Sequence, residues 1–307
     1  MTAPNLYTQS GSNIRRTWAL FTFFFAVVIG VGWVFSRVYG DPGILVIAVG
    51  FSTITSFVSY WWSDSIVLRM ANARAIAMKD NPELYRIVEN LAITAGLPMP
   101  RIYIIPERQL NAFATGRNPE HAVVAVTEGL LAKLDRSELE GVLAHELSHV
   151  GNRDILVSTV AVVLVGFISL ISDIFMRSMM WGGRSRDSRE GGNGIMLLIA
   201  IAFAILAPIS ATLIQLAISR RRESLADSSG ALLTRYPEGL ARALEKIAAD
   251  VVPMATAKNT TSHLWIDDPF TGDNRKSWWH RLFMTHPPIE ERIRALRGQE
   301  SASALPK

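Results

Sequence analysis

The sequence has 307 residues, a mean hydropathy of +0.22 and charged side chains at only 19% of its positions. This composition is too apolar for an ordinary soluble protein of this length and predicts segments that are buried in lipid. Cysteine is absent, which excludes disulfide bonds, thiol catalysis and cysteine ligands to a metal ion. The net charge of +4 comes largely from arginines beside apolar segments, so we expect a lipid bilayer as a partner and no nucleic acid.

Four apolar segments without a charged residue are candidates for membrane-spanning helices of about 20 residues. They cover residues 17–36, 43–62, 155–172 and 195–218. The first is followed by no clear cleavage site and is predicted to be an uncleaved anchor. The third is short and is closed by Asp173, so it is the doubtful one.

The positions of the arginines predict how these segments are oriented. Arg15 and Arg16 precede the first segment and place the N-terminus in the cytoplasm by the positive-inside rule. The second segment returns the chain, so residues 63–154 are predicted to be cytoplasmic, and the arginines at 220–222 predict the same side after the fourth segment. The loop 173–194 is also rich in arginine, which leaves the crossing of the last two segments open. Its part 181–194 is expected to be a solvated loop.

The remaining segments predict an α+β unit that is mostly helical and contains a small β-sheet. Asn81 and Pro82 start a helix that Gly96 ends. Short strands are expected at 101–105, 111–116 and 121–126. A capping box at 137–140 starts a helix that is expected to run almost directly into the third apolar segment. Further helices are expected at 127–134, 223–233, 239–250 and 289–297.

The pentapeptide HELSH at 145–149 is typical of a zinc-hydrolase helix. His145 and His149 are four residues apart, so they lie on one face of a helix and can bind one metal ion together. Glu146 lies beside them, where a carboxylate can take a proton from a zinc-bound water. A catalytic zinc site needs a third protein ligand and one open position.

Several residues are formally available as the third ligand, among them His121, His263, His280, His286 and many carboxylates. Glu223 is the best candidate, because HELSH ends just before the third apolar segment and Glu223 follows the fourth. If those two segments form a hairpin, both sites emerge on the same side of the membrane. Asp227 lies four residues further on the same helical face and can accept the other ring N–H of a ligand histidine.

These features together resemble the HtpX-type integral membrane zinc endopeptidases, which are relatives of the CAAX prenyl endopeptidases. The resemblance covers most of the chain: two N-terminal spans, NAFATG, HELSHV, an apolar pair, RRRESLAD and THPP, in that order. It implies a zincin-like metalloprotease domain with one zinc ion per chain. The implied roles are metal ligand for His145, His149 and Glu223, general base for Glu146, and orientation of a ligand for Asp227.

The resemblance also implies how substrate is bound. NAFATG is similar to an edge strand that holds the substrate backbone by β-addition. The cleft would therefore be lined by Asn111, Ala112, Phe113, Ala114, Thr115 and Gly116. His286 would stabilise the oxyanion. The insertion at 251–283, which contains Trp265, Trp278 and Trp279, departs from the pattern, and we assign it no role.

The function expected from the resemblance is hydrolysis of peptide bonds in cytoplasmic regions of misfolded or damaged membrane proteins, at the inner membrane of a bacterium. The expected organisation is a membrane helix pair (1–62), a metalloprotease domain in two parts (63–154 and 219–297), a membrane hairpin between them (155–218) and a tail (298–307). A CAAX-type prenyl endopeptidase, a non-catalytic zinc-binding scaffold and a transporter are the alternatives. The absence of charged residues within the apolar segments argues against a transporter.

Overall fold

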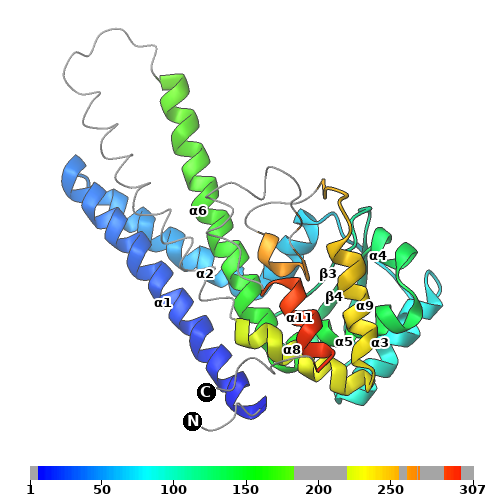
Figure 1. Ribbon diagram of the computed structural model, residues 1–307. Helices are drawn as coiled ribbons and strands as arrows, with labels where there is room; N and C mark the ends of the chain where they lie inside the picture. Colours follow the sequence, from blue (N-terminus) through cyan, green and yellow to red (C-terminus); the bar gives the residue numbers. More distant parts are fainter. Residues whose placement is uncertain (1–5, 183–219, 256–260, 268, 270–286, 299–307) are drawn as a thin grey trace, which may run out of the picture.

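A computed structural model describes residues 6–182, 220–255, 261–267, 269 and 287–298. Three long helices extend from one side of a smaller unit that contains a β-sheet and several shorter helices (Figure 1). The segment 195–218, the loop 183–194, His286, Trp278 and Trp279 lie outside the described residues. The expected class, mostly helical with a small sheet, is confirmed by the described residues.

Helices α1 (Leu6–Tyr39) and α2 (Gly43–Met70) form the N-terminal pair. Their stretches Gly11–Arg37 and Gly43–Met70 are long and apolar enough to cross a membrane, as the sequence predicted. Large apolar side chains such as Trp18 and Ile47 are 65% and 72% exposed in the isolated chain. Exposed apolar surface of this extent is stable in lipid and costly in water.

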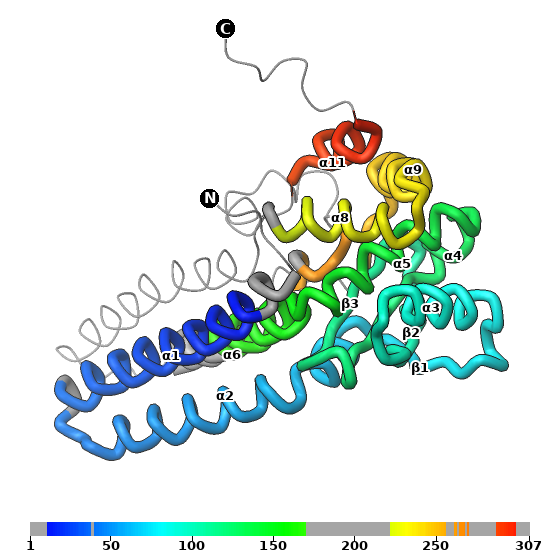
Figure 2. The backbone as a smooth tube through the Cα atoms, turned by 90° about the horizontal axis from the view of Figure 1, so that it is seen from below, coloured from blue at the N-terminus to red at the C-terminus, as the bar shows by residue number. Residues whose placement is uncertain are grey.

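Helix α6 (Asp154–Gly182) packs along α1 through Leu20 and Phe24 on one side and Val157 and Leu164 on the other, and the two helices lie next to each other in Figure 2. The sequence placed a loop from residue 173, and this was wrong for residues 173–182. Asp173 ends the uncharged run but not the helix, because no proline or glycine lies between Asp173 and Gly182.

Helix α5 (Arg136–Gly151) contains HELSH and is followed almost at once by α6, as expected, but the two helices meet at a bend of 85°. The turn is made by Asn152 and by Arg153, whose φ of 57° is left-handed. A left-handed residue cannot continue a right-handed helix, so the chain changes direction here.

The sheet has four strands in the order β1-β2-β4-β3. Strand β2 pairs parallel with β4, whereas β1 and β3 pair antiparallel with β2 and β4, so β3 lies at an edge. The strands are β1 (Arg74–Ala75), β2 (Arg101–Ile105), β3 (Ala112–Thr115) and β4 (Val123–Thr127). The third expected strand began too early, because Pro119–His121 form a 3₁₀ turn capped by the Asn118 side chain.

The short helices begin and end close to their expected bounds. Asn81 caps α3 (Pro82–Ala95), and Gly96 ends it with a φ of 66°, as predicted. Thr127 is the cap of α4 (Glu128–Lys133) rather than its first residue. The other helices among the described residues are α8 (Arg220–Thr234), α9 (Pro237–Ala248) and α11 (Ile289–Leu296), with a 3₁₀ turn at Ser262–Leu264.

The capping box of α5 lies two residues before the predicted position. Asp135 accepts a hydrogen bond from the Glu138 N–H at 3.0 Å, and Glu138 accepts one from the Asp135 N–H at 2.8 Å. Ser137 donates to Asp135 instead, and Glu140 pairs with Arg136. Two overlapping sequences have the right spacing for a box, and the carboxylate at 135 is the one that caps.

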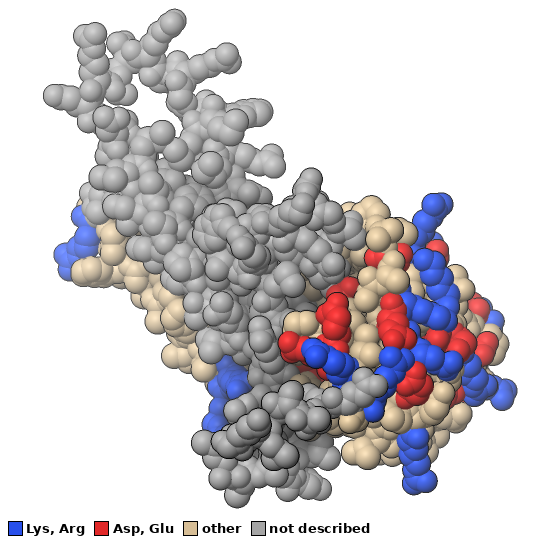
Figure 3. Space-filling view, viewed as in Figure 1, with Lys and Arg blue, Asp and Glu red and all other residues tan. Residues whose placement is uncertain are grey.

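Helix α5 lies at the centre of the sheet-containing unit, where it packs against β3, α3, α8 and α9. Its buried face includes Val142, Leu143 and Leu147, within a core shared with the sheet. The charged side chains visible in Figure 3 gather on the surface of this unit, whereas the visible part of the long helices is mostly uncharged. The fold therefore places HELSH in a packed interior next to the base of the membrane helices.

Candidate metal centre

Helix α5 brings HELSH into a buried environment. The side chains of His145 and Glu146 are almost fully buried, and the side chain of His149 is 15% exposed. The two imidazole rings lie edge to face, with 4.7 Å between their centroids and 3.2 Å between their Nε2 atoms. Helical spacing alone accounts for their shared face, because residues four apart lie one turn above each other.

Glu223 of α8 completes a cluster with the two histidines. Its carboxylate oxygens lie 3.8 Å from Nε2 of His145 and 3.7 Å from Nε2 of His149. One ligand atom from each of the three residues lies within 4.8 Å of the others, and within the described chain this is the one such group. The proximity that the sequence predicted for these three residues is therefore present.

The separations suit a small cation. Two ligands at about 2.05 Å from a tetrahedral zinc ion lie about 3.3 Å apart, close to the 3.2 Å between the Nε2 atoms. Nδ1 of His145 lies 2.9 Å and Nδ1 of His149 lies 3.1 Å from a carboxylate oxygen, which favours the ring proton on Nδ1. The two unprotonated Nε2 atoms, 3.2 Å apart, then repel each other. A cation or a proton between these nitrogens removes the repulsion, so the donor set fits a metal ion.

Each histidine of the cluster has its own carboxylate near the ring nitrogen that faces away from the cluster. Asp227 lies 2.9 Å from Nδ1 of His145, where the sequence analysis expected a carboxylate. Asp154, at the start of α6, lies 3.1 Å from Nδ1 of His149. These contacts select the tautomer with Nε2 free for a metal and hold each ring in place. The contact with Asp154 was not predicted, because it depends on the bend between α5 and α6.

The charges around His149 change its proton affinity in the metal-free cluster. Burial lowers the pKa of His149, but the hydrogen bond with Asp154 and the charges of Glu223, Asp154 and Glu146 outweigh burial and raise it to about 9. A proton at His149 therefore occupies the cluster in the absence of a metal ion and competes with metal binding.

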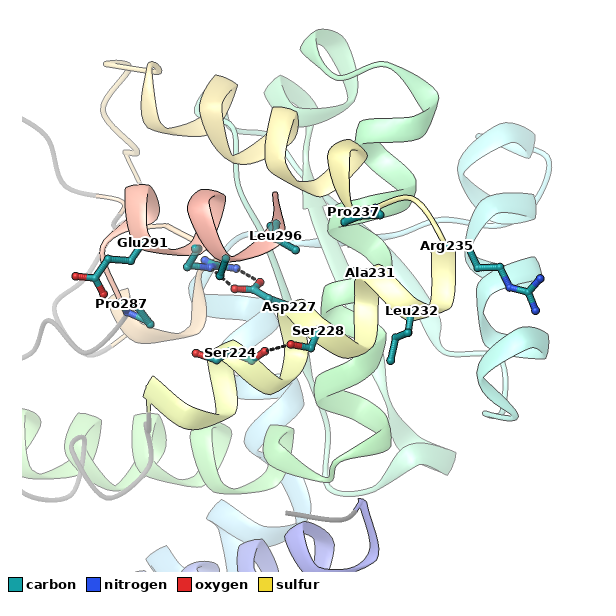
Figure 4. A pocket seen from close by; sticks show the side chains of 12 residues that line it. Ser224, Asp227, Ser228, Ala231, Leu232, Arg235, Pro237, Pro287, Glu291 and Leu296 are labelled. Carbon is teal, nitrogen blue, oxygen red and sulfur yellow. Dashed lines mark hydrogen bonds and ion pairs between the residues drawn. The ribbon is translucent and has the colours of Figure 1, made fainter. Parts of the chain in front are cut away.

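Arg292 of α11 is a further member of the site that sequence reasoning missed. Its guanidinium donates to both Asp227 oxygens, at 2.9 and 2.8 Å, and to the Ile266 carbonyl at 3.1 Å. Figure 4 shows Asp227 pointing toward α11 with both interactions drawn. Burial raises the pKa of the Asp227 carboxyl, but Arg292 and His145 outweigh it and hold the pKa well below its usual range. Asp227 therefore remains a carboxylate beside His145.

Glu146 lies on the side of α5 that faces strand β3. Burial raises the pKa of its carboxyl above the usual range, while His145, His149 and the backbone N–H of Ala114 act in the opposite direction. A carboxylate whose proton affinity is raised by burial is a stronger base than a free carboxylate, which suits a group that accepts a proton and passes it on. The contact with Ala114 connects this carboxyl directly to the edge strand.

Strand β3 lies at the edge of the sheet, which β-addition of a substrate strand would require. The carbonyl of Ala112, which faces away from the sheet, already accepts a hydrogen bond from another part of the chain. The Ile266 N–H donates to it at 3.1 Å. The Asn111 side chain bonds to the Asp267 backbone, and the rings of Trp265 and Phe113 pack edge to face at 5.0 Å. Residues 264–267 therefore lie beside the N-terminal half of β3, next to the cluster.

Two cavities lie in this part of the molecule. One of about 40 Å³ is lined by the cluster, Glu146, Ala114 and Trp265, which is enough room for an ion and a water molecule. A larger one of about 640 Å³ lies between α8 and α11 and is lined by Ser224, Ser228, Asp227 and Arg292 among others (Figure 4). The histidines and Glu146 line only the smaller cavity, so chemistry at the cluster takes place there.

The other histidines considered from the sequence take no part in the cluster as far as the structure describes them. The ring of His121 is exposed and bonds to Asn118 and Arg117, at 2.6 Å each. His280 and His286 lie outside the described residues. The role predicted for His286 as an oxyanion stabiliser stays a prediction.

The structure combines two apolar helices of spanning length with a buried cluster of two histidines and a glutamate. A second glutamate lies beside the cluster. This combination is typical of a membrane-associated metalloenzyme. The chain belongs to peptidase family M48, whose model matches residues 78–300. It is a membrane metallopeptidase, and its resemblance to the HtpX group is confirmed.

The relatives cover nearly the whole chain. A protease HtpX homolog from Pyrococcus furiosus is 49% identical over 284 residues, which are 92% of this chain and 94% of the relative. One from Syntrophobacter fumaroxidans is 48% identical over 94% of this chain and 99% of the relative. The crystal structure of S. mikatae Ste24p matches with a TM-score of 0.49 and 19% identity, and covers 91% of this chain and 66% of that chain.

Proposed function

We propose that this chain is a zinc-dependent endopeptidase that cleaves cytoplasmic regions of misfolded or damaged membrane proteins. The observation that carries the proposal is the convergence of His145, His149 and Glu223, with Glu146 beside them, in one buried cavity. Two histidines, one glutamate and an open position form a typical catalytic zinc site. A structural zinc site has four protein ligands and needs no base, which disfavours the non-catalytic scaffold.

His145, His149 and Glu223 would hold the zinc ion, which would supply the Lewis acidity that makes water reactive at neutral pH. Glu146, with its raised pKa, removes a proton from the attacking water and delivers it to the nitrogen of the breaking peptide bond. Asp227 and Asp154 hold the two imidazoles in the tautomer that a metal ion needs. His286 is proposed to stabilise the negative charge on the carbonyl oxygen.

Strand β3 is proposed to bind the substrate backbone by β-addition, through residues 111–116. The Ala114 N–H contacts Glu146, so an extended chain that lies along this edge passes the base and the cluster. The carbonyl of Ala112 is available to substrate only after Ile266 releases it. A substrate strand therefore either displaces residues 264–267 or pairs with β3 only near Ala114.

The position of the cluster supports a substrate from the membrane. Asp154, which contacts His149, is the first residue of α6, and α6 packs on the apolar helix α1. A peptide bond within reach of the cluster therefore lies close to the membrane surface. We propose a location in the inner membrane of a bacterium, with the catalytic unit in the cytoplasm, on the basis of Arg15 and Arg16.

The test compares wild type, Glu146→Gln and Glu223→Ala in the purified full-length protein. Zinc stoichiometry is measured together with cleavage of an unfolded membrane-protein substrate and with self-cleavage. We expect Glu146→Gln to keep zinc and to lose about 10²- to 10⁴-fold in cleavage rate, and Glu223→Ala to lose both zinc and activity. Cleavage by Glu146→Gln at the wild-type rate would contradict the mechanism. Cleavage confined to prenylated C-terminal peptides would favour the CAAX-type alternative.

A further inference from the structure

Asn13 of α1 contacts the same loop and carboxylate that hold His149. It precedes Asp154 by 141 positions, yet its buried side chain donates from Nδ2 to the Asn152 carbonyl at 2.9 Å and to Oδ1 of Asp154. Both contacted atoms are acceptors, so the NH₂ group of the amide must face them. The orientation of the Asn13 amide is therefore determined by its partners.

The geometry of the bend explains why this contact matters for His149. Residues five apart in a continuous helix are separated by about 140° around the axis, so Asp154 would face away from His149. The 85° bend between α5 and α6 brings the carboxylate back to the ring. Asn13 bridges the bend, because the Asn152 carbonyl ends α5 and Asp154 begins α6.

Asn13 is itself held by the packing of α1. The Thr17 hydroxyl donates to the Asn13 carbonyl at 3.1 Å, and one to two turns further Leu20 and Phe24 pack in the apolar cluster with α6. The Asn13 amide occupies one oxygen of Asp154, and the other oxygen faces His149. A carboxylate fixed at one oxygen has less freedom to rotate away from the ring that it orients at the other.

We propose that Asn13 is a positioning residue for the metal centre, which it influences through Asp154 and His149. The proposal rests on the proposed function only in that a metal ion binds the cluster. Its consequence is that the first membrane helix is part of the metal site as well as an anchor. The metal affinity then depends on how α1 docks against the bend between α5 and α6.

The experiment measures zinc affinity by chelator competition, and kcat and KM separately, in the full-length protein in detergent micelles. Asn13→Ala removes the donor, and Asn13→Asp keeps the shape but removes both N–H groups. We expect each variant to lose about three- to tenfold in zinc affinity. This is at or below the lower end of the range of about 10- to 100-fold for groups that contact a metal ligand directly, because Asn13 acts one residue further away. We also expect kcat to fall more than KM rises. Ser59→Ala is the control, because its buried hydroxyl bonds only within α2 as described, to the Thr55 carbonyl at 2.6 Å.

A double-mutant cycle with Asp154→Asn separates a role through Asp154 from general damage to α1. If Asn13 acts through Asp154, adding Asn13→Ala to Asp154→Asn produces little further loss of zinc affinity. Wild-type affinity in both Asn13 variants, or additive losses in the cycle, would overturn the proposal. If Asn13→Ala does not fold, Asn13→Asp decides. If the Asn13 variants lose zinc affinity but the wild-type protein shows no peptidase activity, the positioning role of Asn13 is supported and the proposed function is rejected.

Discussion

Arg292 of α11 and Asp227 of α8 form a buried two-bond ion pair, with nitrogen–oxygen distances of 2.9 and 2.8 Å. Asp227 also lies 2.9 Å from Nδ1 of His145, and Arg292 itself lies 3.5 Å from Nε2 of the same ring, so helix α11 is connected to the cluster by a carboxylate and by a direct contact. A buried pair of this kind is costly to break, because the remaining charge has no compensation. The pair therefore links the stability of the fold to the geometry of the site.

Replacing Arg292 by alanine is expected to destabilise the protein and to weaken metal binding. Asp227 would remain as an uncompensated buried charge, at a cost of about 3–5 kcal/mol. The measurements are the thermal unfolding midpoint in detergent and the zinc affinity. Arg297→Ala is the matched control, since its ion pairs with Glu238 and Glu245 are solvent-exposed and should contribute little. Equal effects of the two substitutions would reject the special role of the buried pair.

Gly230 of α8 allows this helix to approach α5 closely. A Cβ atom at Gly230 would lie 2.9 Å from the His145 backbone nitrogen and 3.1 Å from its Cα. Gly230→Ala should therefore push α8 outward, move Glu223 away from the histidines and lower zinc affinity about tenfold, with a loss of stability of about 1–3 kcal/mol.

Gly166→Ala in α6 provides the comparison for Gly230→Ala, because no heavy atom of the described chain lies within 4 Å of its Cβ position. Alanine is also favoured over glycine within a helix, so this control should be neutral or slightly stabilising. A Gly230→Ala protein with unchanged zinc affinity would show that α8 can shift without disturbing the ligand.

The metal-free protein should lose stability as the pH rises through the range set by His149. Its pKa is raised from 6.5 to about 9 in the folded state, so the folded protein binds this proton more tightly than the unfolded chain. The stabilisation is fully present below pH 6.5 and is lost as the pH rises through 9. Zinc needs the neutral imidazole, so zinc affinity should change in the opposite direction and increase with pH.

Thermal unfolding midpoints of chelator-treated wild type and His149→Gln, compared across this pH range, measure the effect. The wild-type midpoint should fall more steeply with increasing pH than that of the variant. Parallel curves would show that His149 does not carry the proton.

The proposed orientation can be tested with single cysteines, because the chain has none of its own. Asp41 lies in the exposed turn between α1 and α2, and Glu89 is exposed on α3. In intact bacteria, a membrane-impermeant thiol reagent should label Asp41→Cys, and it should label Glu89→Cys only after permeabilisation. The reverse pattern would place the catalytic unit outside the cytoplasm.

Much of the site could be predicted from local sequence. His145, Glu146 and His149 follow from helical spacing, and Asn81 and Gly96 bound α3 because they satisfy its terminal backbone groups. Prediction was less accurate where two overlapping stretches of sequence fitted the same motif equally well. The sequence allowed a capping box at Ser137 and one at Asp135, and the structure uses Asp135. Similarly, Asp173 marks the end of an uncharged run, but the helix continues beyond it.

The sequence alone determined the chemical nature of this protein, because apolar runs of spanning length and paired histidines four residues apart are local properties of the chain. It also indicated Glu223 and Asp227 as partners. Only the tertiary structure decided which distant groups support the cluster: Arg292 behind Asp227, Asp154 on His149, and Asn13 across the bend. These contacts depend on helix packing and on an 85° change of direction, and no local spacing encodes either of them.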